Sequence, residues 1–218
     1  VVLPLFLLST AGCSNVVTGP SVQNCNIERF WLFSETMGRK IRCAVVLPPA
    51  YEADDTRRFP VLYTLHGHGA PYDTWAHMST LRQAINDKPM IVTCFKADKD
   101  SWYLDSPRDE DTQFVTFFFE EFIPYIDAHY RTRAVPSQRG VTGFSMGGWG
   151  AIHYMLTDPH KFGSVSAVSS MLNYMKVRDF KLVVKDLNRL LGPRPEYDEE
   201  YLKRDVDARL SQAIARGI

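Results

Sequence analysis

The sequence contains little of several features that mark specialised classes of protein. No apolar run reaches the roughly 18 residues that a membrane-spanning helix needs. Neither sign of charge is in excess, because Lys plus Arg and Asp plus Glu each total 25. A general nucleic-acid-binding protein carries surplus basic residues, so that class is disfavoured. The 4 cysteines in 218 residues include no C-x-x-C pair, which argues against a disulfide-dense miniprotein and a zinc ribbon.

The composition is that of a folded protein. Hydrophobic residues make up 45% and charged residues 23% of the chain, which is too apolar for a disordered protein. The sequence shows no internal repeat and no low-complexity tract. Its length suits one domain of the larger kind.

The N-terminal residues resemble the end of a bacterial lipoprotein signal. Residues 1–8 are nearly all apolar, and small residues then lead to Cys13, the position at which lipid would be attached. Thr10 departs from the Leu usual at its position. An ordinary cleaved signal, or a buried strand that ends in Cys, is the alternative. We therefore expect a partial signal segment at 1–13, a tether at 14–26, and an exported protein anchored by lipid in the periplasm or at the outer membrane.

The remaining cysteines leave the disulfide pattern open. If Cys13 carries lipid, three are left, and an odd count cannot pair fully within one chain. Cys94 ends an apolar run and is expected in the core. A bridge between Cys25 and Cys43 is one possibility in an oxidising envelope.

From residue 27 onward, short apolar strands alternate with amphipathic segments. Such alternation predicts a mostly parallel sheet with helices on both faces. Met37-Gly38 indicates a hairpin before the alternating part. Strands are predicted at 27–35, 40–47, 61–65, 90–95, 140–144 and 165–169, and helices at 146–157, 177–191 and 198–217.

A G-x-S-x-G motif surrounds Ser145, between a predicted strand and a predicted helix. This is the context of a nucleophile elbow, where a sharp turn exposes the serine hydroxyl. Gly143 and Gly147 would leave room for the crowded backbone, and Gly148 would let the helix approach the sheet. The alternative is a glycine-rich turn with a structural serine.

The segment Leu65-His66-Gly67-His68-Gly69 directly follows a predicted strand. In α/β-hydrolases this loop supplies one backbone N–H of the oxyanion hole, and the residue after the nucleophile supplies the other. We assign these roles to the N–H groups of His68 and Met146. A metal site built from His66, His68 and His77 is the rival interpretation, and it explains the glycines less well.

With these motifs in place, the chain resembles a family of esterases with the α/β-hydrolase fold. The family includes S-formylglutathione hydrolases, feruloyl and acetylxylan esterases and mycolyltransferases, and the resemblance is greatest to small bacterial tributyrin-type esterases. It implies that a serine attacks an acyl ester, a histidine acts as base and then acid, and an acid orients the histidine; no cofactor or metal is involved. The matching segments are 45–51, 59–69, 101–107, 120–130 and 140–151.

The chain departs from this family in its histidines. In the family the acid and the histidine lie well downstream of the serine, whereas here only His153 and His160 follow Ser145. His153 falls two turns along the predicted helix and His160 in a loop. We therefore expect the histidine and the acid beyond Ile218, and with them the last strands of an incomplete domain that spans 27–218.

Two further segments could shape substrate selection. Trp102 and Tyr103, in the loop 96–112, could stack on a sugar or an aromatic acyl group, or could pack that loop onto the core. The acidic residues of the loop lack the spacing of a calcium-binding EF-hand. Residues 171–197 have the position and composition of a cap over the site.

The sequence thus predicts a serine carboxylesterase that hydrolyses short-chain or carbohydrate-linked acyl esters through an acyl-enzyme on Ser145. Its partners would be small-molecule or carbohydrate esters. We expect it to bind no nucleic acid, and to contact a membrane only through the lipid anchor. Two alternatives stay open: a homologue without catalysis that acts as an envelope binding protein, and an acyltransferase to a sugar.

Overall fold

A computed structural model describes residues 25–173 and 180–215. Cys13 and most of the predicted signal and tether lie outside the described residues. None of the helices in the described ranges is long and apolar enough to cross a membrane. Cys25, Cys43 and Cys94 are buried free cysteines, so the possible bridge between the first two is not formed.

The core of the molecule is a six-stranded sheet in the order β1-β2-β4-β3-β5-β6. β1 and β2 form the predicted hairpin, with Gly38 at a φ of 62° in its turn, and β2 pairs antiparallel with β4. The other pairings, β4-β3, β3-β5 and β5-β6, are parallel. The strands are β1 (Asn26–Ser34), β2 (Arg39–Leu47), β3 (Val61–Leu65), β4 (Ile91–Phe95), β5 (Arg139–Phe144) and β6 (Ser164–Val168).

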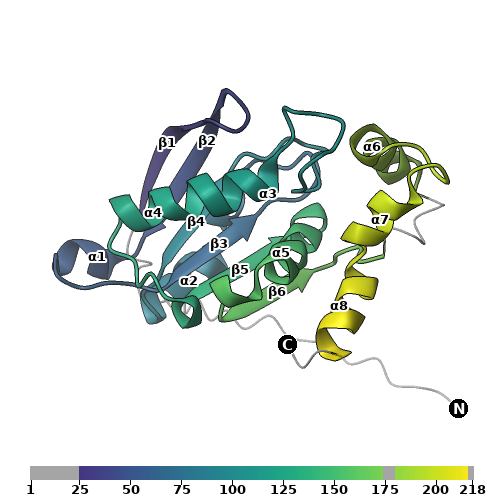
Figure 1. Cartoon of the computed structure of the whole chain (residues 1–218). Coiled ribbons are helices and arrows are strands. Elements are labelled where there is room, and N and C mark those ends of the chain that lie inside the picture. The colour runs from purple at the N-terminus through teal and green to yellow at the C-terminus, as the bar shows by residue number, and fades with distance from the viewer. Residues whose placement is uncertain (1–24, 174–179, 216–218) are drawn as a thin grey trace, which may run out of the picture.

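Helices cover both faces of this sheet (Figure 1). The larger core lies under α3 (Phe114–Thr116), α4 (Ile123–His129) and α5 (Met146–Thr157). The smaller core lies under α2 (Ser79–Asp87) on the opposite face. This division follows from right-handed crossovers, because the connection from β3 to β4 and the connection from β4 to β5 run in opposite directions across the sheet. The prediction of a mostly parallel, doubly covered sheet is confirmed.

The segment between β4 and β5 contains one helical run of mixed geometry. α3 passes into a π-helical stretch (Phe117–Phe122) and then into α4. Pro124 lies at the start of α4, and because proline has no N–H it cannot bond to the preceding turn. The irregular turn therefore lies directly before this proline.

The C-terminal part differs from the sequence expectation. One helix is predicted at 198–217, but the structure has α7 (Asp198–Arg204) and α8 (Val206–Ala215). Asp205 breaks the run with an extended backbone, and its carboxylate accepts a hydrogen bond from the Ala208 N–H at 3.0 Å. An Asp in this position caps a new helix. α6 (Lys181–Leu191) precedes them, and α1 (Pro49–Ala53) is a short helix after β2.

β6 forms one edge of the sheet. Within the described residues it pairs with β5 alone, and Val165 and Val168 are 37% and 45% exposed. Ser145 and the loop after β3 lie at the carboxyl ends of the parallel strands, the edge at which open α/β sheets bind ligands.

Candidate active site

Ser145 occupies the sharp turn between β5 and α5. Its φ of 54° and ψ of −117° are strained for a residue with a side chain, at a cost of about 1–3 kcal/mol. The surrounding backbone fixes this conformation: the Ser145 N–H donates to the Val168 carbonyl at 2.9 Å, and its carbonyl accepts from Gly148 and Trp149. The turn therefore has the geometry of a nucleophile elbow.

The glycines on both sides of Ser145 are required by space. A Cβ on Gly143 would lie 2.1 Å from the Gly147 carbonyl oxygen, and a Cβ on Gly147 would lie 2.3 Å from that of Leu65. These neighbours are backbone atoms and cannot rotate away. A Cβ on Gly148 would lie 2.9 Å from the Ser170 Cβ, so this glycine lets α5 approach the end of β6.

The loop after β3 lies against the serine. A Cβ placed on Gly67 would be 3.6 Å from the Ser145 Cβ. His68 follows Gly67 in this loop, and Met146 is the first residue of α5. Neither backbone N–H donates to an acceptor elsewhere in the described residues. Both remain available to a substrate oxygen, and the N-terminal end of α5 adds its partial positive charge.

The three histidines of the rival metal interpretation have different partners. The His66 ring nitrogens lie 2.8 and 3.2 Å from the carbonyl oxygens of Gly67 and Ala97, and burial lowers the pKa of His66. His68 Nε2 is 3.1 Å from Asp186, and His77 Nε2 is 3.2 Å from Asp73. The structure does not bring these rings together.

Comparison with known proteins agrees with this geometry. The family model named Esterase matches residues 34–215. The chain belongs to this esterase family.

Individual relatives of the chain have related names. Esterase Rv1288 of Mycobacterium tuberculosis (strain ATCC 25618 / H37Rv) is 32% identical over 173 residues, which cover 74% of this chain and 36% of that protein. S-formylglutathione hydrolase of Bos taurus is 28% identical over 154 residues, which cover 62% and 53%. A solved ferulic acid esterase is 26% identical with a TM-score of 0.66 over 85% of this chain and 75% of that one. The chain thus spans between about a third and about half the length of these curated relatives. Its fold is that of the α/β-hydrolases, as predicted.

The structure favours packing over substrate contact for Trp102 and Tyr103. Their side chains are 3% and 0% exposed. The Tyr103 hydroxyl donates to the His66 carbonyl at 2.9 Å, and its ring lies where a Cβ on Gly150 would come within 2.7 Å. Both residues have positive φ angles of 52° and 53°. They therefore fix the loop onto the core, and neither offers a surface to a sugar or an acyl group.

The two histidines after Ser145 are placed away from it, as predicted. The His153 ring stacks on Trp149 with centroids 4.5 Å apart, and its Nδ1 accepts from Arg209 of α8. Burial, followed by Arg209, lowers the pKa of His153 well below its ordinary value. His160 lies in the short turn after α5. Within the described residues, the Ser145 hydroxyl makes no hydrogen bond with a histidine.

Asp186 is the residue near the site that the sequence analysis missed. It lies on α6, in the cap-like segment, and is 5% exposed. Its Oδ2 is 3.1 Å from His68 Nε2 and accepts a hydrogen bond from Trp102 Nε1 at 3.3 Å. The sequence does carry a signal for this residue, because Asp186 falls on the same helical stripe as the apolar residues Val183, Leu187 and Leu190. An acid within an apolar stripe points to a buried polar partner.

Proposed function

We propose that this protein is a serine carboxylesterase that hydrolyses short-chain or carbohydrate-linked acyl esters through an acyl-enzyme on Ser145. The observation that carries the proposal is the strained Ser145 backbone, held beside the loop after β3. A structural serine has no need of this conformation, whereas a nucleophile must project from the end of the sheet. The names of the relatives, feruloyl esterase and S-formylglutathione hydrolase among them, agree with ester substrates.

We propose distinct roles for the residues of the site. The Ser145 Oγ attacks the ester carbonyl carbon, and the carbonyl oxygen becomes an oxyanion. The N–H groups of His68 and Met146 donate hydrogen bonds to that oxygen; one such donor is typically worth about 2.7–4 kcal/mol in the transition state. The alcohol then leaves, and water releases the acyl group from Ser145.

The mechanism needs a base for the Ser145 proton. His66 is buried against backbone carbonyls. His153 lies in the second half of α5, and its ring accepts a hydrogen bond from Arg209 of α8. We propose that the base is a histidine that follows Ile218 in the protein. An acidic residue between Ile218 and that histidine would orient its ring. The coding sequence should continue in frame through an acidic residue to a histidine about 100 residues after Ser145.

The test is hydrolysis of short p-nitrophenyl esters by the protein as encoded, including any residues after Ile218. Ser145→Ala should lower kcat by about 10⁶-fold, the scale seen when a triad nucleophile is removed. Ser137→Ala is the matched control, because Ser137 is exposed before β5 and should leave the rate unchanged. Undiminished turnover by Ser145→Ala would refute the assignment.

Two outcomes would favour the alternatives. A stop codon after Ile218, with no turnover and retained ligand binding, would favour an envelope binding protein. Ester formation on an added sugar acceptor would instead show acyl transfer. In either case we propose export and a lipid anchor at Cys13, supported by the apolar and small residues at 1–12 that precede it.

A further inference from the structure

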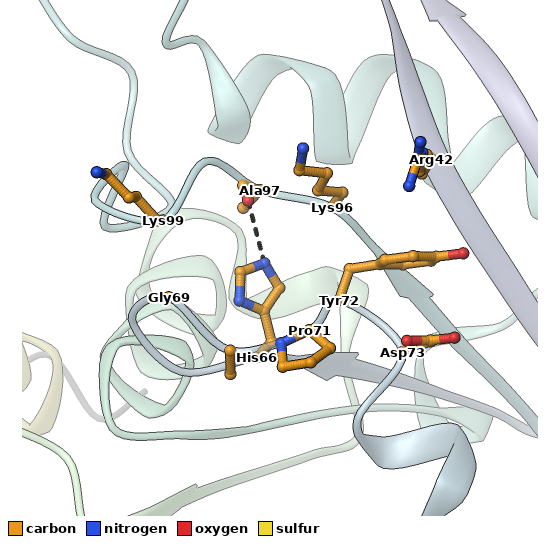
Figure 2. Close-up of a pocket in the computed structure, with 10 residues that line it drawn as sticks. Arg42, His66, Gly69, Pro71, Tyr72, Asp73, Lys96, Ala97 and Lys99 are labelled. Carbon is orange, nitrogen blue, oxygen red and sulfur yellow. Dashed lines mark hydrogen bonds between the residues drawn. The ribbon is translucent and has the colours of Figure 1, made fainter.

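A cavity of about 410 Å³ opens between the loop after β3 and the loop after β4. Its volume falls within the roughly 300–1,000 Å³ typical of small-molecule sites. In Figure 2 the basic residues Arg42, Lys96 and Lys99 lie along one side, and Pro71 and Tyr72 lie along the other. The cavity therefore places three cationic side chains around one small volume of a protein whose formal net charge is zero.

The acidic residues around the cavity already have basic partners. Asp73, which also lines the cavity, and two aspartates of the loop after β4 each pair with an arginine from elsewhere in the chain. The pairs are Asp73 with Arg29 at 3.1 Å, Asp98 with Arg39 at 2.5 Å and Asp100 with Arg189 at 3.2 Å.

The three cations of the cavity are left without such partners. Within the described residues, Arg42, Lys96 and Lys99 make no ion pair. Arg42 is oriented by stacking, with its guanidinium 4.8 Å from the centre of the Trp31 ring. A guanidinium held in this way can bind an oxyanion with two parallel hydrogen bonds. The unbalanced charge among the residues that line the cavity is therefore positive.

The cavity is close to Ser145 along the loop after β3. Gly67 lies beside the serine, and Gly69 lines the cavity two residues later. At about 3.8 Å between successive Cα atoms, Gly69 is at most about 8 Å from Gly67. The Gly69 N–H also donates to the Lys99 carbonyl at 3.2 Å, so this loop joins both walls. A substrate at Ser145 is thus within reach of the cavity.

We propose that this cavity is an anion subsite, and that it binds a carboxylate or phosphate group carried by the ester substrate. The second half of this proposal rests on the proposed esterase function. The anion would lie between Arg42 and Lys96, with Lys99 adding to the positive potential. The subsite would select acidic esters over neutral esters of the same size.

The binding half is tested first, without any catalysis, on the full encoded protein. Isothermal titration with benzoate and with inorganic phosphate distinguishes a carboxylate from a phosphate ligand, and benzamide serves as the uncharged analogue of benzoate. We expect one of the anions to bind, with an affinity that falls as salt is added. The double variant Arg42→Gln/Lys96→Gln should weaken that binding at least about tenfold.

Lys88→Gln is the matched control for the loss of a charge. Lys88 is exposed at the other end of β4, after α2, and its loss should change the affinity by less than about twofold. The anion subsite is refuted if neither anion binds the wild-type protein. It is also refuted if the double variant binds as tightly as the wild type, because the three cations would then be ordinary solvated side chains.

The substrate half is tested by paired esters. Mono-p-nitrophenyl succinate carries a carboxylate on the acyl part and is paired with p-nitrophenyl butyrate; 4-acetoxybenzoate carries one on the alcohol part and is paired with 4-acetoxybenzamide. For the pair whose carboxylate reaches the cavity, kcat/KM should be higher for the acidic ester than for the neutral one. The double variant should reduce that preference about tenfold, mainly through KM. Anion binding without any such preference would overturn the substrate role alone. Absence of all turnover would count against the esterase proposal and leave the binding result standing.

Discussion

Asp186 gives the sharpest test of how the cap-like segment is fixed to the site. Its carboxylate is buried on α6 and faces two loops at once, through His68 after β3 and Trp102 after β4. Asp186→Asn keeps the size of the side chain but removes its charge and one of its two oxygen acceptors. We expect this variant to loosen α6 from both loops.

The size of the effect follows from the contacts. Both partners contact the same carboxylate oxygen, so the amide oxygen of Asn can still accept from both of them. A hydrogen bond to a charged group contributes about 1.5–3 kcal/mol and one to a neutral group about 0.5–1.5 kcal/mol, so the substitution removes about 1–1.5 kcal/mol from each of the two contacts. The free energy of unfolding should therefore fall by about 2–3 kcal/mol. For a chain of this length, each kcal/mol lowers Tm by about 2–4 °C, so the expected decrease is about 4–12 °C.

The assay is thermal unfolding of the wild type, Asp186→Asn, His68→Ala and the double variant. If Asp186 acts through His68, the double variant should show a coupling of at least about 0.5 kcal/mol, the lower end seen for residues in contact. Glu196→Gln is the control, because Glu196 is exposed in the loop between α6 and α7 and its loss removes the same charge. A positioning role should also lower kcat with little change in KM, since His68 carries a proposed oxyanion donor.

The reasoning fails if Asp186→Asn unfolds at the temperature of the wild type, or if the two substitutions are additive. Additivity would mean that the carboxylate is stabilised by groups other than His68. A lower Tm with unchanged kcat would confirm the structural link and refute its role in positioning the oxyanion loop.

Two other predictions concern residues away from Asp186. Gly147→Ala should cost several kcal/mol or prevent folding, because its Cβ would lie 2.3 Å from the Leu65 carbonyl oxygen, a backbone overlap worse than ordinary overpacking; soluble yield and urea unfolding would show it, and wild-type stability would refute the elbow geometry. Burial and Arg209 lower the pKa of His153, so the unfolded chain takes up its proton first as the pH falls. The free energy of unfolding should therefore decrease below about pH 6.5, by up to about 1.4 kcal/mol per pH unit for this histidine. Urea titrations from pH 7.5 to 5 should show a shallower decrease for His153→Gln, with the rest of the slope due to His66, whose pKa is also lowered; an unchanged slope would contradict this account.

The sheet and the elbow could be predicted because their causes are local. Val61–Leu65 and Met146–Thr157 have the predicted bounds, and the other strands differ from prediction by about one residue. A fully buried parallel strand must be a continuous apolar run, so its limits are visible in the sequence. The glycines around Ser145 are visible for a similar reason, since no other residue fits beside the backbone carbonyls.

The remaining features depend on contacts between distant segments. The carboxylate of Asp186 meets His68 across 118 residues of sequence, and nothing in either neighbourhood specifies that partner. Trp102 and Tyr103 resemble a stacking surface in sequence, and only their burial under α5 and α6 decides that they pack. The break between α7 and α8 at Asp205 could not be seen in the sequence, because the apolar stripe continues regularly across it. Asp205 is nevertheless a local signal for a helix start, since its carboxylate caps the N–H of Ala208.

The loop after β3 joins the parts of the proposed machinery, and each successive residue faces a different part. Gly67 lies beside Ser145, the His68 ring contacts Asp186 of the cap-like segment, and Gly69 lines the cationic cavity. A shift of the cap would therefore move the proposed oxyanion donor, and an anion held in the cavity would contact the same loop from the other side. The Gly69 N–H also donates to the Lys99 carbonyl, so this loop is linked to the loop after β4 as well. The three roles should therefore be separable by substitution but coupled in their effect on the rate, which is the behaviour expected of adjacent residues on one rigid loop.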